Sequence, residues 1–217
     1  MTPTAPNEPV TTFDIDWAPD DQIDLVADRL RQRGVRSTWF VTHDSSAVDR
    51  LRREPELFEL GMHPNFLEGS THGGTPDEVI QHCCELVSDS TSTRSHGLVQ
   101  SSHLLNQILR SFPQRAEASI YLGRAAYAPP IDYYWMDLHT VRTPTVWADD
   151  LETMRPDPLW DCDALRSVCR GLLILTFHPI HVIAEQQRPS RLRTVQEEAH
   201  GRRRDRGERA RQARPAG

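Results

Sequence analysis

The hydrophobic positions in residues 10–41 follow first a strand pattern, then a helix pattern, then a strand pattern again. Val10 to Ile15 and Val35 to Val41 are short apolar or β-branched runs, which predict strands. The segment between them has the i, i+3, i+4, i+7 spacing of an amphipathic helix, with apolar residues at Ile23, Val26, Ala27 and Leu30. Asp20 is a suitable N-cap and Gly34 a suitable helix end. The order strand, helix, strand is typical of an α/β sheet with parallel strands.

The same alternation continues along the chain. A glycine-containing loop at residues 64–74 leads to a strong helix start, with Thr75 as N-cap, Pro76 at the first helical position and Glu78 completing a capping box. Residues 123–160 are rich in proline and predict loops with one or two strands. Further strands are expected at residues 57–62, 91–93, 118–122 and 172–177, and further helices at residues 46–53, 75–87, 104–109 and 161–171.

Two carboxylates close the first predicted strand. Asp14 and Asp16 stand at i and i+2, so an extended chain presents both on the same side. Such close like charges repel unless a divalent cation or a shared proton offsets them, and either arrangement is useful in catalysis. A solvated turn after a strand explains the pair equally well when it is taken alone.

Other chemically active side chains follow later strands. His63 ends one strand, Arg94 and His96 follow another, and His178 ends the last. The carboxyl ends of parallel strands gather at one edge of a sheet, so we expect these groups to meet Asp14 and Asp16 there. A single histidine is more often a core or capping residue, but together one Asp and two His suit Zn²⁺ or another divalent metal. The second Asp would remain free as a base.

Charge divides the chain into two parts. Residues 1–185 carry a net charge near −12, which argues against nucleic-acid binding, whereas residues 186–217 contain ten Arg and carry about +6. We interpret residues 1–185 as one folded domain and residues 186–217 as a disordered tail.

The sequence contains no Lys, which excludes mechanisms that need a lysine Schiff base or a P-loop lysine. Four cysteines at spacings unlike those of zinc ligands are expected to be reduced thiols.

Several runs, taken in order, resemble the motifs of the polysaccharide deacetylase family, the NodB-homology carbohydrate esterases. They are Thr12-Phe13-Asp14-Ile15-Asp16, residues 34–42, Glu59-Leu60-Gly61-Met62-His63 and residues 173–178. A second set is similar to a subgroup associated with surface-polysaccharide biosynthesis, the WbmS-like deacetylases: Asp14-Ile15-Asp16-Trp17, His63-Pro64-Asn65-Phe66, Arg94-Ser95-His96-Gly97 and Phe177-His178-Pro179-Ile180-His181. The resemblance spans roughly residues 10–182 and implies a distorted (β/α) barrel.

This resemblance implies a role for each matching residue. Asp14 would be the general base, Arg94 would orient it and His178 would be the general acid. Asp16 and His63 would bind the metal, and because position 67 is Leu where the family has its second histidine, His72 is our candidate for that ligand. The substrate-binding candidates are His96, Trp147 and Asp149.

The implied activity is metal-dependent removal of an N-acetyl group from an amino sugar in surface-polysaccharide or lipopolysaccharide biosynthesis. Zn²⁺ is the preferred metal, with Co²⁺, Ni²⁺ and Mn²⁺ as alternatives. A barrel without activity that binds a glycan or a protein partner is the alternative function. Two other families also have Asp-x-Asp after an apolar strand. Haloacid-dehalogenase phosphatases normally need a Lys, which this sequence lacks, and metal-dependent glycosyltransferases would leave the histidines at the strand ends unexplained.

Without a signal-peptide pattern or a membrane span in the sequence, we expect a cytoplasmic location. The sequence leaves the oligomeric state open.

Overall fold

The computed structural model describes residues 9–16, 18–112 and 115–187, of which residues 184–187 are described by their backbone alone. Apart from its first two positions, the Arg-rich tail predicted at residues 186–217 lies outside the described residues. Residues up to Val182 form one compact unit, which contains the whole sheet.

The architecture of this unit is a nine-stranded, mainly parallel sheet with helices between its strands. The strand order is β7-β8-β5-β4-β3-β2-β1-β11-β9, and only β7 and β8 pair in antiparallel fashion. Two further short strands, β6 and β10, pair separately. The strands are β1 (Pro9–Asp14), β2 (Ser37–Val41), β3 (Phe58–Met62), β4 (Ser92–Thr93), β5 (Ala116–Glu117), β6 (Tyr127–Ala128), β7 (Ile131–Trp135), β8 (Leu138–Arg142), β9 (Thr145–Ala148), β10 (Arg170–Gly171) and β11 (Leu173–Phe177).

The capping signals of the sequence hold for some helices but not for the first, where the predicted N-cap Asp20 is the first helical residue and Pro19 precedes it without a side-chain cap. Ser45 caps one helix by accepting a hydrogen bond from the Val48 amide, and the capping box of Thr75 and Glu78 is present as predicted. The α-helices are α1 (Asp20–Arg33), α2 (Ser46–Arg52), α3 (Pro76–Leu86), α4 (Ser102–Ser111), α5 (Asp149–Thr153), α6 (Cys162–Val168) and α7 (Pro179–Gln187), and a 3₁₀ turn, η1, spans His96–Leu98. Within the described residues, no helix is both long and apolar enough to cross a membrane.

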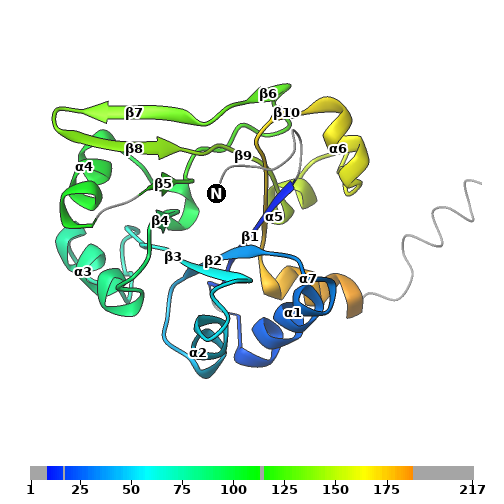
Figure 1. Cartoon of the computed structure of the whole chain (residues 1–217), viewed down its shortest axis with the longest axis horizontal. Coiled ribbons are helices and arrows are strands. Elements are labelled where there is room, and N and C mark those ends of the chain that lie inside the picture. The colour runs from blue at the N-terminus through cyan, green and yellow to red at the C-terminus, as the bar shows by residue number, and fades with distance from the viewer. Residues whose placement is uncertain (1–8, 17, 113–114, 188–217) are drawn as a thin grey trace, which may run out of the picture. The chain divides into compact units, whose positions relative to one another are not determined.

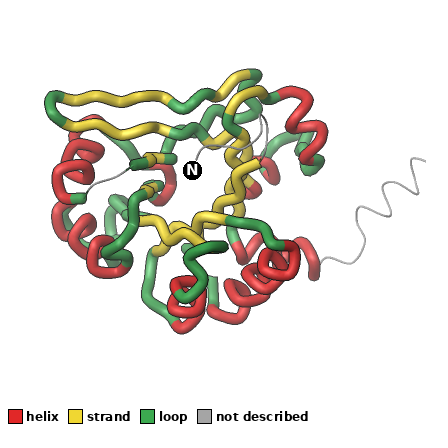
Figure 2. The backbone as a smooth tube through the Cα atoms, viewed as in Figure 1, coloured by secondary structure: helices red, strands yellow, loops and turns green. Residues whose placement is uncertain are grey.

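The sheet curls into a distorted barrel. Figure 1 and Figure 2 show the strands bending around a common interior, with α1 to α4 on the outer side. After β5 the chain leaves β8 and approaches β9, where the Thr145 amide donates to the Ile120 carbonyl (2.8 Å) and the Leu122 amide donates to the Thr145 carbonyl (2.9 Å). These bonds join the two sides of the curl, so the predicted distorted (β/α) barrel is confirmed.

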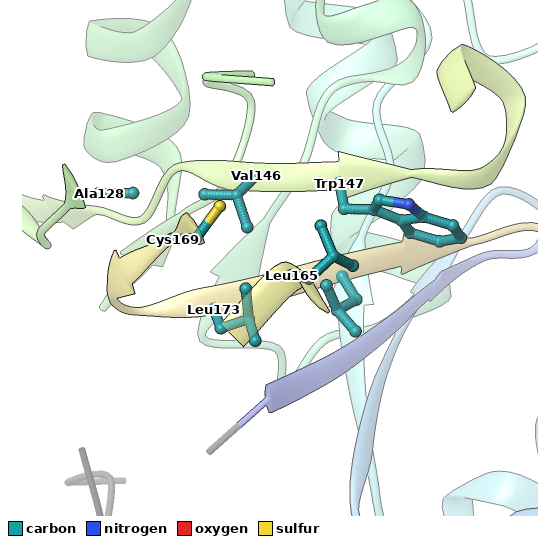
Figure 3. Close-up of a cluster of buried hydrophobic side chains, with 7 residues drawn as sticks. Ala128, Val146, Trp147, Leu165, Cys169 and Leu173 are labelled. Carbon is teal, nitrogen blue, oxygen red and sulfur yellow. The ribbon is translucent and has the colours of Figure 1, made fainter. Parts of the chain in front are cut away.

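A hydrophobic cluster lies between β9, β11 and α6 (Figure 3). The indole of Trp147 packs against the ring of Phe177, with 5.0 Å between the ring centroids. The buried members of this cluster are Ala128, Val146, Trp147, Leu165, Cys169, Leu173 and Leu175. This cluster fixes the two strands whose ends carry Asp149 and His178.

Residues 123–160 differ most from the sequence prediction, which gave one or two strands. The structure has four strands and a helix there, β6 to β9 and α5. The strand expected at residues 118–122 is shorter and earlier, at Ala116–Glu117, and the residues after it form the bonds that close the barrel. The other predicted strands lie within two residues of those observed.

Candidate active site

The carboxyl ends of five parallel strands bring polar side chains together. Asp14 ends β1, with Asp16 two residues further, and His63 follows β3. Arg94 and His96 follow β4, Asp149 follows β9, and His178 follows β11. Contacts between these side chains, described below, connect residues up to 162 positions apart in the sequence.

Asp16 is the centre of this group. Its Oδ1 lies 2.9 Å from Nδ1 of His96 and 3.3 Å from Nε2 of His63, and its Oδ2 lies 3.5 Å from Nε2 of His178. Burial alone would raise the pKa of Asp16, but the hydrogen bonds from His63 and His96 outweigh it and hold the pKa well below its usual range. Asp16 is therefore an anion that attracts cations.

The backbone at Asp16 is strained in order to aim this carboxylate. Its φ of 38° lies in the left-handed region, which a side chain with a Cβ rarely adopts, and the Thr42 hydroxyl donates to its carbonyl oxygen (2.7 Å). Such strain costs about 1–3 kcal/mol and concentrates at functional sites.

Asp16, His63 and His96 fit a divalent metal. One oxygen or nitrogen from each lies within 4.8 Å of the others. In a tetrahedral site with bonds of about 2.0–2.1 Å, neighbouring ligand atoms are about 3.3 Å apart, close to the 2.9 and 3.3 Å found here. His63 is 1% exposed and its Nδ1 has no hydrogen-bond partner among the described residues, so the surrounding protein does not account for both of its ring nitrogens.

The structure places His72, the sequence-based candidate for this ligand, in a different environment. Its Nε2 lies 2.9 Å from the Thr42 carbonyl oxygen, to which it donates, and its Nδ1 accepts from the Asn65 amide at 3.3 Å. Both ring nitrogens therefore have protein partners, and burial together with the neighbouring His82 lowers the pKa of His72. In the structure His96, rather than His72, lies beside Asp16 and His63.

Arg94 holds the second carboxylate, Asp14, from inside the barrel. Its guanidinium is fully buried and donates to Asp14 Oδ1 (2.8 Å) and to the Thr12 hydroxyl (2.9 Å). Its other nitrogens reach Thr145 and the Ala118 carbonyl oxygen. The buried Asp14 is thus a fixed, paired acceptor at the mouth of the barrel.

His178 and Asp149 form a tight pair beside Asp16. The Nδ1 of His178 lies 2.6 Å from Asp149 Oδ1, and the His178 amide donates to Oδ2 at 2.8 Å. Burial of the ring lowers the pKa of His178, but the hydrogen bond and charge of Asp149 outweigh it and raise the pKa to about 9. His178 is therefore protonated at neutral pH, with Nε2 directed at Asp16.

Trp147 and Asp149, both expected at the substrate, are almost inaccessible. Trp147 is 3% exposed and belongs to the cluster of Figure 3, where its indole N–H donates to the Leu159 carbonyl oxygen at 2.6 Å. Asp149 is 2% exposed and contacts His178. In this structure Asp149 contacts the His178 ring and Trp147 packs against Phe177, the residue before His178.

A cleft of about 390 Å³ opens beside Asp16 and His96, two of the three residues that fit a metal. Its wall includes His43, which directly follows the strand β2 and Thr42. His43 was not among the candidates predicted from the sequence, although it too follows the end of a parallel strand. The residues around the cleft are Asp16, Ala18, Pro19, Thr42, His43, Asn65, Thr71, His72 and His96.

Comparisons with known proteins give a family and several similar structures. A family model described as WbmS-like polysaccharide deacetylase matches residues 11–196. The structure is similar to that of WbmS from Bordetella bronchiseptica, which is assigned as a polysaccharide deacetylase involved in O-antigen biosynthesis. The identity is 35%, the TM-score is 0.69, and the match covers 81% of this chain and 73% of that one.

Two more distant structures also match, and the first of them shares the fold. A 4-alpha-glucanotransferase from Thermococcus litoralis is 10% identical with a TM-score of 0.54, over 79% of this chain and 32% of that one. A carbohydrate esterase family 4 pseudoenzyme from Bacillus anthracis is 15% identical with a TM-score of 0.44, over 80% and 55%. A search of curated proteins found no match.

Proposed function

This chain belongs to the WbmS-like polysaccharide deacetylase family, and we propose that it is a metal-dependent hydrolase that removes the N-acetyl group from an amino sugar. The reaction would serve surface-polysaccharide or lipopolysaccharide biosynthesis, as the assignment of the Bordetella relative suggests. The observation that carries the proposal is the meeting of Asp14, Asp16 and His178 at one barrel mouth, because amide hydrolysis needs a base, an electrophile and an acid together.

Asp16, His63 and His96 would hold the metal, with Zn²⁺ preferred and Co²⁺, Ni²⁺ or Mn²⁺ as alternatives. When bound, the metal supplies Lewis-acid polarisation of the acetyl carbonyl and lowers the pKa of a nearby water. Two nitrogens and one oxygen leave positions open for substrate, as in catalytic zinc sites.

Asp14 acts as the general base in this proposal. Arg94 pairs with its Oδ1, which holds the carboxylate stationary while a proton is taken from the attacking water. Arg94 donates to two residues of β1, to Thr145 on β9 and to the Ala118 carbonyl oxygen after β5, and these contacts tie the position of the base to the barrel wall.

His178 acts as the general acid. An amine leaves the tetrahedral intermediate only when it is protonated, and the Nε2 proton of a charged His178 meets this need. Asp149 holds the ring through Nδ1, so the donating nitrogen faces Asp16. The raised pKa keeps the acid loaded at neutral pH.

The test is acetate release by the zinc-reconstituted full-length chain. The substrates are N-acetylated amino sugars presented as nucleotide-linked, lipid-linked and polymeric forms. We expect acetate from at least one carrier, with a loss of at least about 100-fold in Asp14→Asn. Asp21→Asn, on the exposed side of α1, is the matched control and should keep activity.

Equal acetate release by Asp14→Asn and the wild type would exclude Asp14 as the base. No acetate from any carrier would refute the hydrolase and favour a deacetylase-fold module that binds a glycan or a protein.

A further inference from the structure

A second group of ligand-type side chains lies next to the first. Asp149 Oδ1 is 2.6 Å from Nδ1 of His178 and 3.4 Å from Nδ1 of His181. One such atom from each of the three residues lies within 4.8 Å of the others. Two imidazoles and a carboxylate are a donor set that Zn²⁺ takes in proteins.

The carboxylate of this group is held in place by the backbone. Asp149 Oδ1 accepts from the Asp150 amide at 2.7 Å, and Oδ2 accepts from the His178 amide at 2.8 Å. Because the surrounding structure fixes the carboxylate, a cation bound there would not have to order it.

His181 has an available nitrogen that faces the carboxylate. Its Nδ1 is buried and makes no hydrogen bond within the described residues, although it is the atom 3.4 Å from Asp149. The His181 side chain is 43% exposed, so an ion can reach the group from solvent. His178 and His181 stand three residues apart at the start of α7, which brings their ring centroids within 5.2 Å.

We propose that Asp149, His178 and His181 bind a second divalent metal ion, Zn²⁺ foremost, and that its binding inhibits the enzyme. The ion takes the place of the proton on His178 Nδ1, which is released to solvent, and the 2.6 Å pair opens to about 3.3 Å. This opening moves the imidazole whose Nε2 now lies 3.5 Å from Asp16, so the acid leaves the position from which it donates. The inhibition rests on the proposed function, whereas the metal binding does not.

The test measures zinc bound per full-length chain after equilibrium dialysis against excess Zn²⁺. We expect two zinc ions per chain in the wild type. His181→Ala and Asp16→Ala should each bind one, because each loses one of the two sites, and the double variant His181→Ala/Asp16→Ala should bind none. His103→Ala, which removes an exposed histidine of α4, is the control and should keep two. If Asp16→Ala does not fold, His96→Ala replaces it. One ion in the wild type, or two in His181→Ala, would overturn the second site.

Inhibition is tested by comparing acetate release at one equivalent and at excess Zn²⁺. The wild type should lose about 100-fold, the typical contribution of a general acid, and His181→Ala should lose none of its own starting rate. Equal losses in both proteins would overturn the inhibitory role. Two ions in the wild type and one in His181→Ala, without acetate from either, would support the second site and refute the deacetylase.

Discussion

His178 and Asp149 face each other at the ends of two adjacent strands, β11 and β9, with 2.6 Å between Nδ1 and Oδ1. The pairing depends on the parallel register of these strands, in which Thr176 lies opposite Ala148. Each residue directly follows its strand, so the register brings the carboxylate to the ring. The hydrophobic cluster behind the strands fixes this register.

Replacing Asp149 by Asn should weaken the acid. Burial then dominates, so the pKa of His178 should fall from about 9 and the ring should lose its proton at lower pH. Because activity needs the protonated ring, the alkaline limb of the rate profile should move to lower pH, with a loss of about 10- to 100-fold at pH 8. The measurement is kcat against pH for wild type and variant.

Asp132→Asn is the matched control, because it removes the carboxylate partner of another histidine, His139, on the exposed β7 and β8 hairpin. Its profile should match that of the wild type. An unchanged alkaline limb in Asp149→Asn would show that Asp149 does not set the protonation of His178.

Metal content should follow the geometry of the Asp16 group. In the His181→Ala background, which removes the proposed second site, adding Asp16→Ala, His63→Ala or His96→Ala should leave less than a tenth of the metal that His181→Ala alone holds at one equivalent of Zn²⁺, measured by elemental analysis after gel filtration. His72→Ala should retain it, because both ring nitrogens of His72 bond to protein groups. Metal loss in His72→Ala together with retention in His96→Ala would restore the ligand expected from the sequence.

Much of the candidate site was predictable because of the parallel sheet. Strand ends can be recognised from short apolar runs, and parallel strands bring their ends to one edge, so Asp14, Asp16, His63 and His178 could be grouped without coordinates. The choice between His72 and His96 could not be made in this way. It depends on how the loop at residues 64–74 folds back, and on the turn at Gly97 (φ 58°) that follows His96.

The β7 and β8 hairpin was not predicted because its turn lacks the usual signal. Two-residue hairpin turns favour Asn-Gly or similar pairs, since they need positive φ. Here the loop is Met136-Asp137, and Met136 adopts a φ of 54°. A methionine in this conformation is rare, so sequence patterns give no indication of the turn.

Arg94 should be irreplaceable by lysine. Lysine lacks the planar fork that reaches Thr12, Asp14 and Thr145 at once, so the buried carboxylate of Asp14 would lose the geometry of its ion pair. We expect Arg94→Lys to lose about 3–5 kcal/mol of unfolding free energy in urea denaturation. Arg110 forms an exposed ion pair with Asp137 at 3.8 Å, and Arg110→Lys should change the free energy of unfolding by less than about 0.5 kcal/mol. Equal stability of the two variants would mean that the Arg94 contacts contribute little.

His72 should make the folded state sensitive to acid. Its pKa is lowered by burial and by His82, and its Nδ1 must stay unprotonated to accept from the Asn65 amide. The unfolded chain therefore takes up the proton first, at the ordinary pKa of 6.5, so stability falls as the pH drops from 6.5 toward the lowered folded value.

His72→Gln cannot take up this proton, so the stability difference between wild type and variant should be largest near pH 7.5 and shrink toward pH 5. Near pH 7.5 we expect the variant to be about 1–3 kcal/mol less stable, because a buried bonding partner is altered. The measurement is urea unfolding across this range with saturating Zn²⁺. His103→Gln, on the exposed face of α4, should run parallel to the wild type. A difference for His72→Gln that stays constant with pH would mean that His72 is not held neutral by the fold.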